Sequence, residues 1–151
     1  MAGASLSATG IKEALAEFKG IQTRTQHAHP FMQRAALRMH GNAIKHFSEQ
    51  RGPNGPWGST KFYDETGGPA VRGGRGGTKI LMDTGLLRGS ILFQGHDQDA
   101  RVYTETVYAA THQYGDPSRH IMARPFLWLD EKTKESIKDD FIPWLLGGIV
   151  K

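Results

Sequence analysis

The chain has 151 residues, about the size of one ordinary domain, and its 38% hydrophobic and 23% charged residues are typical of a globular protein rather than a disordered one. The absence of cysteine excludes both a disulfide framework and a thiolate metal site. The net charge is +4, and the basic excess lies before residue 80, where eleven Lys and Arg stand against five Asp and Glu; this excess suits either a nucleic-acid surface or an acidic face on a neighbouring subunit.

Two amphipathic helices are predicted in the N-terminal third. Apolar residues at helical spacing indicate the first over about 8–25, with Ser7 or Thr9 as its cap. They are Ile11, Ala14, Leu15, Phe18 and Ile21. Pro30 suits the first turn of a second helix that ends near Gln50. Its apolar stripe is Met32, Ala36, Met39, Ala43 and Phe47.

A long glycine-rich loop or arm is predicted over 51–79. This segment holds nine glycines and three prolines, which disfavour regular secondary structure. Loops of this length inside a compact domain are usually functional or disordered. Its few large apolar residues are Trp57, Phe62 and Tyr63.

A small sheet is predicted next. Residues 86–94 and 101–108 are rich in β-branched and aromatic types and flank a polar turn, which favours a hairpin. A short helical turn over 108–114 follows. Residues 121–126 are predicted to be a further strand, placed at an edge because Pro125 lacks an amide hydrogen.

The chain ends with a helix that Asp130 can cap and that Pro143 kinks or ends. The order of elements predicts a single α+β domain over 1–151, with a small antiparallel sheet flanked by two N-terminal helices and a C-terminal helix. The longest largely apolar stretch, 142–150, is far shorter than the roughly 20 residues that span a bilayer. A soluble intracellular protein without a membrane partner is therefore expected.

No pattern for catalysis or metal binding stands out. His40 and His46 are too far apart for a helical zinc pair, and Gly-x-Ser-x-Gly is absent. The glycine run 73–77 lacks the Gly-Lys-Ser/Thr order of a phosphate loop. An Arg-Gly-Gly type of nucleic-acid contact through Arg72 and Arg75 remains an alternative. We expect no catalytic residue, cofactor or metal.

Four segments, in order, resemble the phage virion morphogenesis family, which includes tail completion proteins of contractile-tailed phages. They are 47–57, ending in a Pro-x-Gly-x-Trp turn; 79–91, with Leu-x-x-Thr-Gly-x-Leu-x-x-Ser-Ile; 108–115, Tyr-Ala-Ala-Thr-His-Gln-Tyr-Gly; and 121–127, Ile-Met-Ala-Arg-Pro-Phe-Leu. The likeness covers about 30–130. Trp128 departs from the small residue often found there, and 67–77 is unusually rich in glycine.

The resemblance implies a structural virion protein, either a tail completion (tail terminator) protein or a neck subunit. It would form a ring, sixfold by the resemblance, at the head–tail junction, after assembly in the host cytoplasm. Its partners would be further copies of itself, tail tube or sheath proteins, and neck or connector proteins, and DNA would pass through without specific binding. The alternatives are a head completion or adaptor protein on the portal side, a nucleic-acid-binding protein, and a hydrolase with an unrecognised site.

Ring subunits need edges and arms that neighbours can cover, so we expect 51–79 to become ordered on assembly and 121–126 to contact the next subunit. Deleting 67–77 should then leave a folded subunit that fails to complete tails. At least one of Leu86, Leu87 and Ile91 should reach the core. The expected interface residues are Trp57, Phe62, Tyr63, Arg72, Arg75, His112, Gln113, Arg124 and Phe126.

Overall fold

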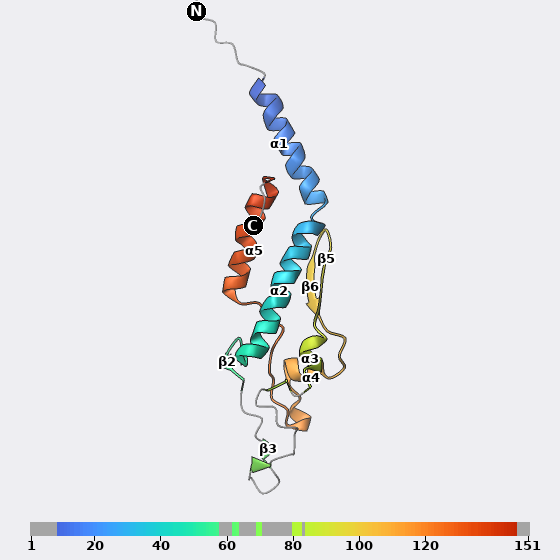
Figure 1. Ribbon diagram of the computed structural model, residues 1–151, viewed down its shortest axis with the longest axis vertical. Helices are drawn as coiled ribbons and strands as arrows, with labels where there is room; N and C mark the ends of the chain where they lie inside the picture. The colour runs from blue at the N-terminus through green and yellow to red at the C-terminus, as the bar shows by residue number, and fades with distance from the viewer. Residues whose placement is uncertain (1–8, 58–61, 64–68, 71–79, 83, 148–151) are drawn as a thin grey trace, which may run out of the picture.

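The computed structural model describes residues 9–57, 62–63, 69–70, 80–82 and 84–147. Its helices are α1 (Thr9–Gln26), α2 (His29–Glu49), α3 (Leu86–Gly89), α4 (Ala109–Tyr114) and α5 (Glu131–Leu145). Its strands are β1 (Arg51–Gly52), β2 (Gly55–Pro56), β3 (Phe62–Tyr63), β4 (Pro69–Ala70), β5 (Leu92–Gly95) and β6 (Ala100–Tyr103). The predicted α+β class is confirmed (Figure 1). Among the described helices, none has the length and apolar character needed to cross a membrane.

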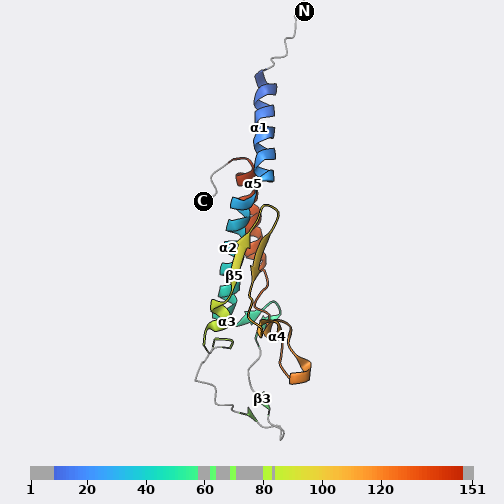
Figure 2. The ribbon, with the colours of Figure 1, turned by 90° about the vertical axis from the view of Figure 1, so that its right-hand side faces the viewer.

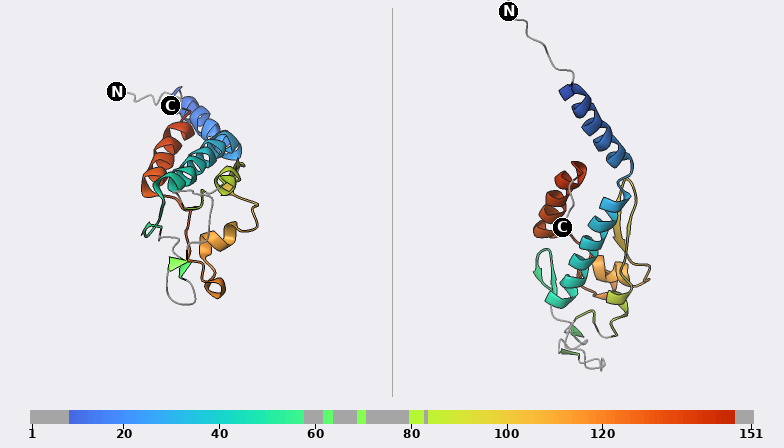
Figure 3. Two further views of the ribbon diagram at one scale, coloured as in Figure 1. Left: turned by 60° about the horizontal axis from the view of Figure 1, so that its bottom comes forward. Right: turned by 45° about the horizontal axis from the view of Figure 1, so that its top comes forward.

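Helix α2 is the central element of the fold. It lies between α5 on one side and the β5–β6 hairpin on the other (Figures 1 and 3). The helix starts at the predicted place because proline is accepted in a first turn, where an amide hydrogen would have no helical partner. It ends at Gln50, whose left-handed backbone lets its N–H donate to the carbonyl of His46.

The β5–β6 hairpin is antiparallel, with Leu92 opposite Tyr103 and Gly95 opposite Ala100. Its end is held against α2, because the amide of Gly95 donates to Gln33 Oε1 at 2.7 Å. A Cβ atom at Gly95 would lie 2.3 Å from the backbone nitrogen of Gln33. Only glycine therefore allows the hairpin to approach the helix this closely.

The predicted strand over 86–94 is only partly correct. Its first half forms α3, which starts after Gly85 with φ at 72°, a backbone conformation that glycine adopts without strain. Helical geometry turns Leu86 outward, at 67% exposure, and buries Leu87 and Ile91 at 4% each. The expectation that at least one of these residues reaches the core is confirmed by Leu87 and Ile91, and Leu86 does not contribute to it.

The predicted strand over 121–126 is not formed. Its one described ladder contact is a single bridge between Ile121 and Asp116. Pro125 has no amide hydrogen to donate, and the amides on either side of it bond to α4 instead of to a strand. Each described sheet is accordingly a two-stranded hairpin: β1–β2, β3–β4 and β5–β6.

The segment 51–79 is not a loop throughout. Arg51 pairs with Pro56 and Gly52 with Gly55 in the tight β1–β2 hairpin, which leads Trp57 back into the core. Strands β3 and β4 form a second short hairpin. The expectation that this arm becomes ordered on assembly concerns mainly 58–61, 64–68 and 71–79, which lie outside the described residues.

Helix α5 begins where the sequence predicted. Asp130 is its N-cap and accepts a hydrogen bond from the Thr133 amide at 2.7 Å. Pro143 lies inside the helix, which ends two residues later at Leu145. The ring of Phe31 on α2 packs on those of Phe141 and Trp144, at centroid distances of 5.3 and 5.1 Å.

Candidate subunit interface

The four segments that carry the family resemblance meet in one hydrophobic core. Its buried members are Ala43, Phe47, Trp57, Leu87, Ile91, Ala109 and Phe126. Phe47 lies at its centre, with ring centroids 5.7 Å from Trp57 and 5.2 Å from Phe126. The residues of these segments therefore first of all build the subunit.

Trp57 and Phe126, two of the expected interface residues, are part of this core. Trp57 Nε1 donates to the carbonyl of Pro125 at 3.1 Å, which ties the β1–β2 hairpin to the segment before α5. Phe126 has no exposed surface and Trp57 almost none. Side chains buried in this way have no surface to offer a neighbour, so the interface assignment of these two residues is replaced by a core role.

Gln113 on α4 acts as a substitute for a missing strand. Its Oε1 accepts from the amides of Phe126 and Leu127, both at 3.0 Å, and its Nε2 donates to the Leu127 carbonyl at 3.1 Å. One amide side chain thus satisfies three backbone groups in a segment that has no strand beside it. Gln113 is engaged within the subunit.

Arg124 is buried and does not present its charge at the surface, contrary to the expectation. It is 8% exposed, and its backbone amide donates to the carbonyl of His112 at 2.6 Å. Burial lowers the pKa of the Arg124 guanidinium. Among the described residues no carboxylate pairs with it, and its Nε has no hydrogen-bond partner.

His112 lies next to this guanidinium. Burial, and then the positive charge of Arg124, lower the pKa of His112, which favours its neutral imidazole. Its Nδ1 is buried without a partner in the described part of the chain. His112 and Arg124, which were both predicted at a subunit interface, therefore contact each other within the chain.

His46 is a buried residue that the sequence did not single out for this role. Its ring stacks on that of Trp128, with centroids 4.3 Å apart and planes 10° apart. Nδ1 lies 3.0 Å from the Phe126 carbonyl, which can only accept, so the proton is on Nδ1. Burial lowers the pKa of His46, although the Phe126 bond and the charge of Asp130 act the other way. Trp128, the departure from the family pattern, is used to cover this histidine.

The structure does not test the interface assignment of four residues. Phe62 and Tyr63 form β3, but their side chains lie outside what the structure describes. Arg72 and Arg75 fall in 71–79, which is likewise outside the described residues. Their assignment to an interface stays a prediction.

A shallow pocket of about 400 Å³ lies between α2 and α5. Three of its four charged groups have partners: Arg38 bonds to Asp140 and Ser136, and Lys45 lies 3.9 Å from Asp130, whereas Lys132 forms no ion pair among the described residues. No group of three potential metal ligands occurs among the residues in the described ranges. Most of the polar lining of the pocket is thus engaged in contacts within the chain.

Large apolar side chains are exposed on several elements of the described chain, and two sets of them lie on α1 and around α4. One set, on α1, is Ile11, Leu15 and Phe18. The other, around α4, is Val107, Tyr114 and Met122. Groups of exposed apolar side chains often mark surfaces that bind another protein. The apolar stripe of α1 could be predicted from the sequence. Its exposure could not, because only the structure shows that the rest of the described chain leaves it uncovered.

A comparison with known protein families bears on the resemblance carried by the four segments. The chain matches the profile of the phage virion morphogenesis family over residues 8–145. It belongs to the phage virion morphogenesis family. The match runs from the start of α1 to the end of α5, well beyond the four segments that carry the resemblance. No curated protein and no solved structure matches the chain significantly.

Membership in the phage virion morphogenesis family gives the chain a role in the structure or morphogenesis of a phage particle. The recognition made from the four segments is thereby confirmed. In this chain, residues of the four motif segments form the hydrophobic core.

Proposed function

We propose that this protein is a tail completion (tail terminator) or neck subunit that forms a ring at the head–tail junction and is needed to complete tails and join them to heads. The family match over nearly the whole chain is the observation that carries the proposal. The protein acts by assembly rather than turnover. Its neighbours are copies of itself, tail tube or sheath proteins, and neck or connector proteins.

The distribution of exposed apolar residues supports an assembling subunit. The α1 and α4 sets lie at opposite ends of the elongated subunit, as Figures 1 and 2 both show. A subunit with two separate apolar surfaces can contact two different neighbours, as a ring subunit between head and tail must. The excess of basic residues is mild, which suits a wall along which DNA slides.

Imaging of phage particles tests this proposal. Removing the gene should leave heads and tails unjoined, or tails of defective length, and a plasmid copy should restore joined particles. Labelled protein should be found at the head-proximal end of the tail. A label on the portal side of isolated heads would favour the head completion alternative, and normal joined particles without the gene would refute both.

Point variants in the plasmid copy sharpen the test. Met122→Glu places a charge on the exposed α4 set and should reduce joined particles, because a charge is costly in an interface core. Gln98→Glu, the same change of charge on an exposed turn residue, is the matched control and should restore normally. Equal restoration by both variants would mean that the α4 set makes no contact in the particle.

A further inference from the structure

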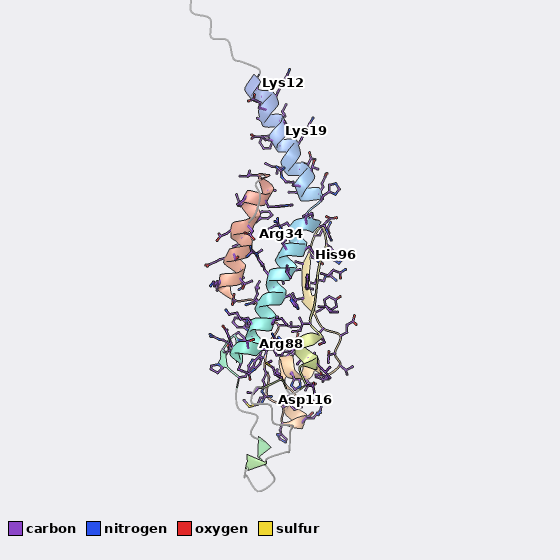
Figure 4. The ribbon with its side chains drawn as sticks, viewed as in Figure 1. Lys12, Lys19, Arg34, Arg88, His96 and Asp116 are labelled. Atoms are coloured by element: carbon purple, nitrogen blue, oxygen red, sulfur yellow. The ribbon has the colours of Figure 1, made fainter. Side chains whose placement is uncertain are left out.

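One side of α2 carries a row of basic side chains, Arg34, Arg38 and Lys45, with Gly41 between them. At 3.6 residues per turn, these four positions lie within about 60° of one another around the helix. Figure 4 labels Arg34 on the upper half of α2. Arg34 is exposed and forms no ion pair within the described residues. A Cβ atom at Gly41 would meet nothing within 4 Å, so the row has an open gap at this point.

The outer face of α5 is acidic. Glu135 is nine residues from Trp144, so it lies about 180° around the helix from the ring that packs on α2. Glu131 and Asp139 lie about one turn before and after it, and all three carboxylates are on exposed residues. Glu131 pairs with Lys134, but Glu135 and Asp139 have no ion pair in the described ranges.

Apolar side chains accompany both charged surfaces. Ile142 and Leu146 continue the outer face of α5 and are 55% and 66% exposed. Leu37 lies beside the basic row of α2 and is 53% exposed. Lys132 and Lys138 stand at the two edges of the α5 face, about 60° from Glu135, and leave its middle acidic. The two surfaces thus match in charge, and each adds exposed apolar area of the kind that interfaces bury.

We propose that the outer face of α5 binds the basic row on α2 of a second copy of this chain. Surfaces of opposite charge attract each other and exclude partners of the wrong sign. DNA phosphates also suit a basic row, but DNA leaves the acidic α5 face and the exposed Leu37 without a role. A second copy accounts for both surfaces at once.

The contact joins two different surfaces, so it is heterologous and can repeat from copy to copy around a ring. The α1 and α4 sets lie at the two ends of the subunit, whereas α2 and α5 run along its length (Figures 1 and 2). The ends are therefore left for other virion proteins and the sides for further copies. This inference rests on the ring part of the proposed function and adds the two surfaces that meet.

Contacts within one subunit show which residues of the two helices lie level with each other. The helices run in opposite directions, because α5 begins beside Asn42 and its last turn packs on Phe31. Arg38 bonds to both Ser136 and Asp140, so the stretch between those two residues lies level with Arg38. Each further residue along either helix changes the level by about 1.5 Å.

In a ring whose axis runs along these helices, all copies have the same height, and the same levels hold between neighbours. Glu135 of one copy then lies level with Gly41 of the next, between Arg38 and Lys45. Asp139 lies level with Arg38. The gap at Gly41 therefore receives a carboxylate with a basic side chain on either side.

Two charge variants test the contact in the full-length protein. Glu135→Lys with Asp139→Lys makes the α5 face basic, and Arg34→Glu with Lys45→Glu makes the α2 row acidic. Sedimentation velocity should show self-association of the parent, and association at least about tenfold weaker for each variant alone, because like charges then meet. An equimolar mixture should associate again, because each surface then meets its opposite on the other variant. Recovery in the mixture also shows that both variants are folded.

The matched control is Glu13→Lys with Glu17→Lys, the same change of charge at two exposed positions with the same spacing on α1. It should associate like the parent. The proposal is overturned if either charge variant associates like the parent, if the mixture stays dissociated, or if the parent is monomeric at every concentration. In the last case, DNA binding that is lost in Arg34→Glu with Lys45→Glu would assign the row to DNA.

Cysteine cross-linking tests which residues meet, since the chain has no cysteine of its own. A Gly41→Cys chain mixed with a Glu135→Cys chain should form a disulfide between the two chains under mild oxidation, because the two positions face each other at one level. Glu13→Cys replaces Glu135→Cys in the control mixture and should not form this link. Equal linking in both mixtures, or none in the first, would overturn the arrangement.

Restoration of a phage that lacks the gene separates this inference from the proposed function. Each charge variant alone should fail to restore joined particles, and the two expressed together should succeed. If each variant alone succeeds, the contact between α2 and α5 of two copies is wrong while the proposed function stands. If particles join without the gene, the proposed function is wrong whatever the protein does in solution.

Discussion

Helices α1 and α2 follow each other in the chain and have similar lengths, 18 and 21 residues, but they differ in what surrounds them. The apolar face of α1 is made of large residues and is exposed over its first half. The buried face of α2 combines three alanines with Phe31 and Phe47 near its ends and also holds Asn42 and His46. Both helices carry large apolar residues, but only those of α2 are covered.

The difference shows that burial depends on the elements that cover a helix and not on the size of its apolar residues. The β5–β6 hairpin approaches α2 closely because Gly95 has no side chain, and α5 covers another side of the helix. Nothing in the described fold approaches the free half of α1 in this way. A strong stripe without a cover within the chain points to a cover from outside it.

The largest expected effect compares a phenylalanine from each helix. Phe47→Ala should lower the free energy of unfolding by about 3–5 kcal/mol, because it opens a cavity at the centre of the core. Phe18→Ala, on the exposed face of α1, should change it by less than about 0.5 kcal/mol in the dissociated subunit. Urea unfolding at low protein concentration measures both. Comparable losses would show that α1 is covered within its own subunit.

A pair of glycines tests how closely α2 is covered. Gly95→Ala should cost about 1–3 kcal/mol, because its Cβ would overlap the α2 backbone at Gln33. Gly41→Ala, on α2 itself with nothing near its Cβ, should add about 0.5–1 kcal/mol through helix propensity. Thermal melts should shift in opposite directions. A shift in the same direction would contradict the close contact between hairpin and helix.

Removing the N-cap of α5 should lower the free energy of unfolding by a smaller amount. Asp130→Ala removes the bond to the Thr133 amide and leaves the buried Asn42 amide, which donates to Asp130 at 2.7 Å, without its partner. A loss of about 1–2 kcal/mol is expected. Glu135→Ala, at an exposed position of the same helix, should leave the urea midpoint within error. An unchanged midpoint for Asp130→Ala would refute the cap.

The smallest expected effect is on pH dependence. Because the pKa of His46 is lowered by burial, the unfolded chain binds more protons than the folded one below the ordinary histidine pKa of about 6.5. The free energy of unfolding should therefore be highest above that pH and should fall as the pH drops below it. His46→Asn should melt lower but with a flatter dependence between about pH 5.5 and 7.5.

Elements defined by local spacing could be predicted from the sequence. The cap residue Asp130, the proline near the start of α2 and the turn between β5 and β6 each act within a few residues. The conversion of 86–90 to a helical turn could not be predicted, because its apolar residues fit a strand equally well. The turn is fixed by Gly85 and by packing with distant segments.

The interface residues were the weakest part of the sequence prediction. Aromatic residues suit both an interface and a core, so residue type alone did not separate Trp57 and Phe126 from true surface anchors. The failure at 121–126 has a different cause. Its backbone partner is the side chain of Gln113, and no periodic pattern forecasts that a single amide will replace a strand.

The bond from Arg24 to the Leu145 carbonyl has a mechanical consequence. Helix α1 is joined to α2 through residues 27–28 and to the end of α5 through this arginine, so tension on its free end enters the body at two points. The two helices that receive this tension are in direct contact, because Phe31 of α2 packs on Trp144 of α5. A neighbour that pulls on α1 would thus strain both long helices together, and the subunit would carry the load as one rigid piece.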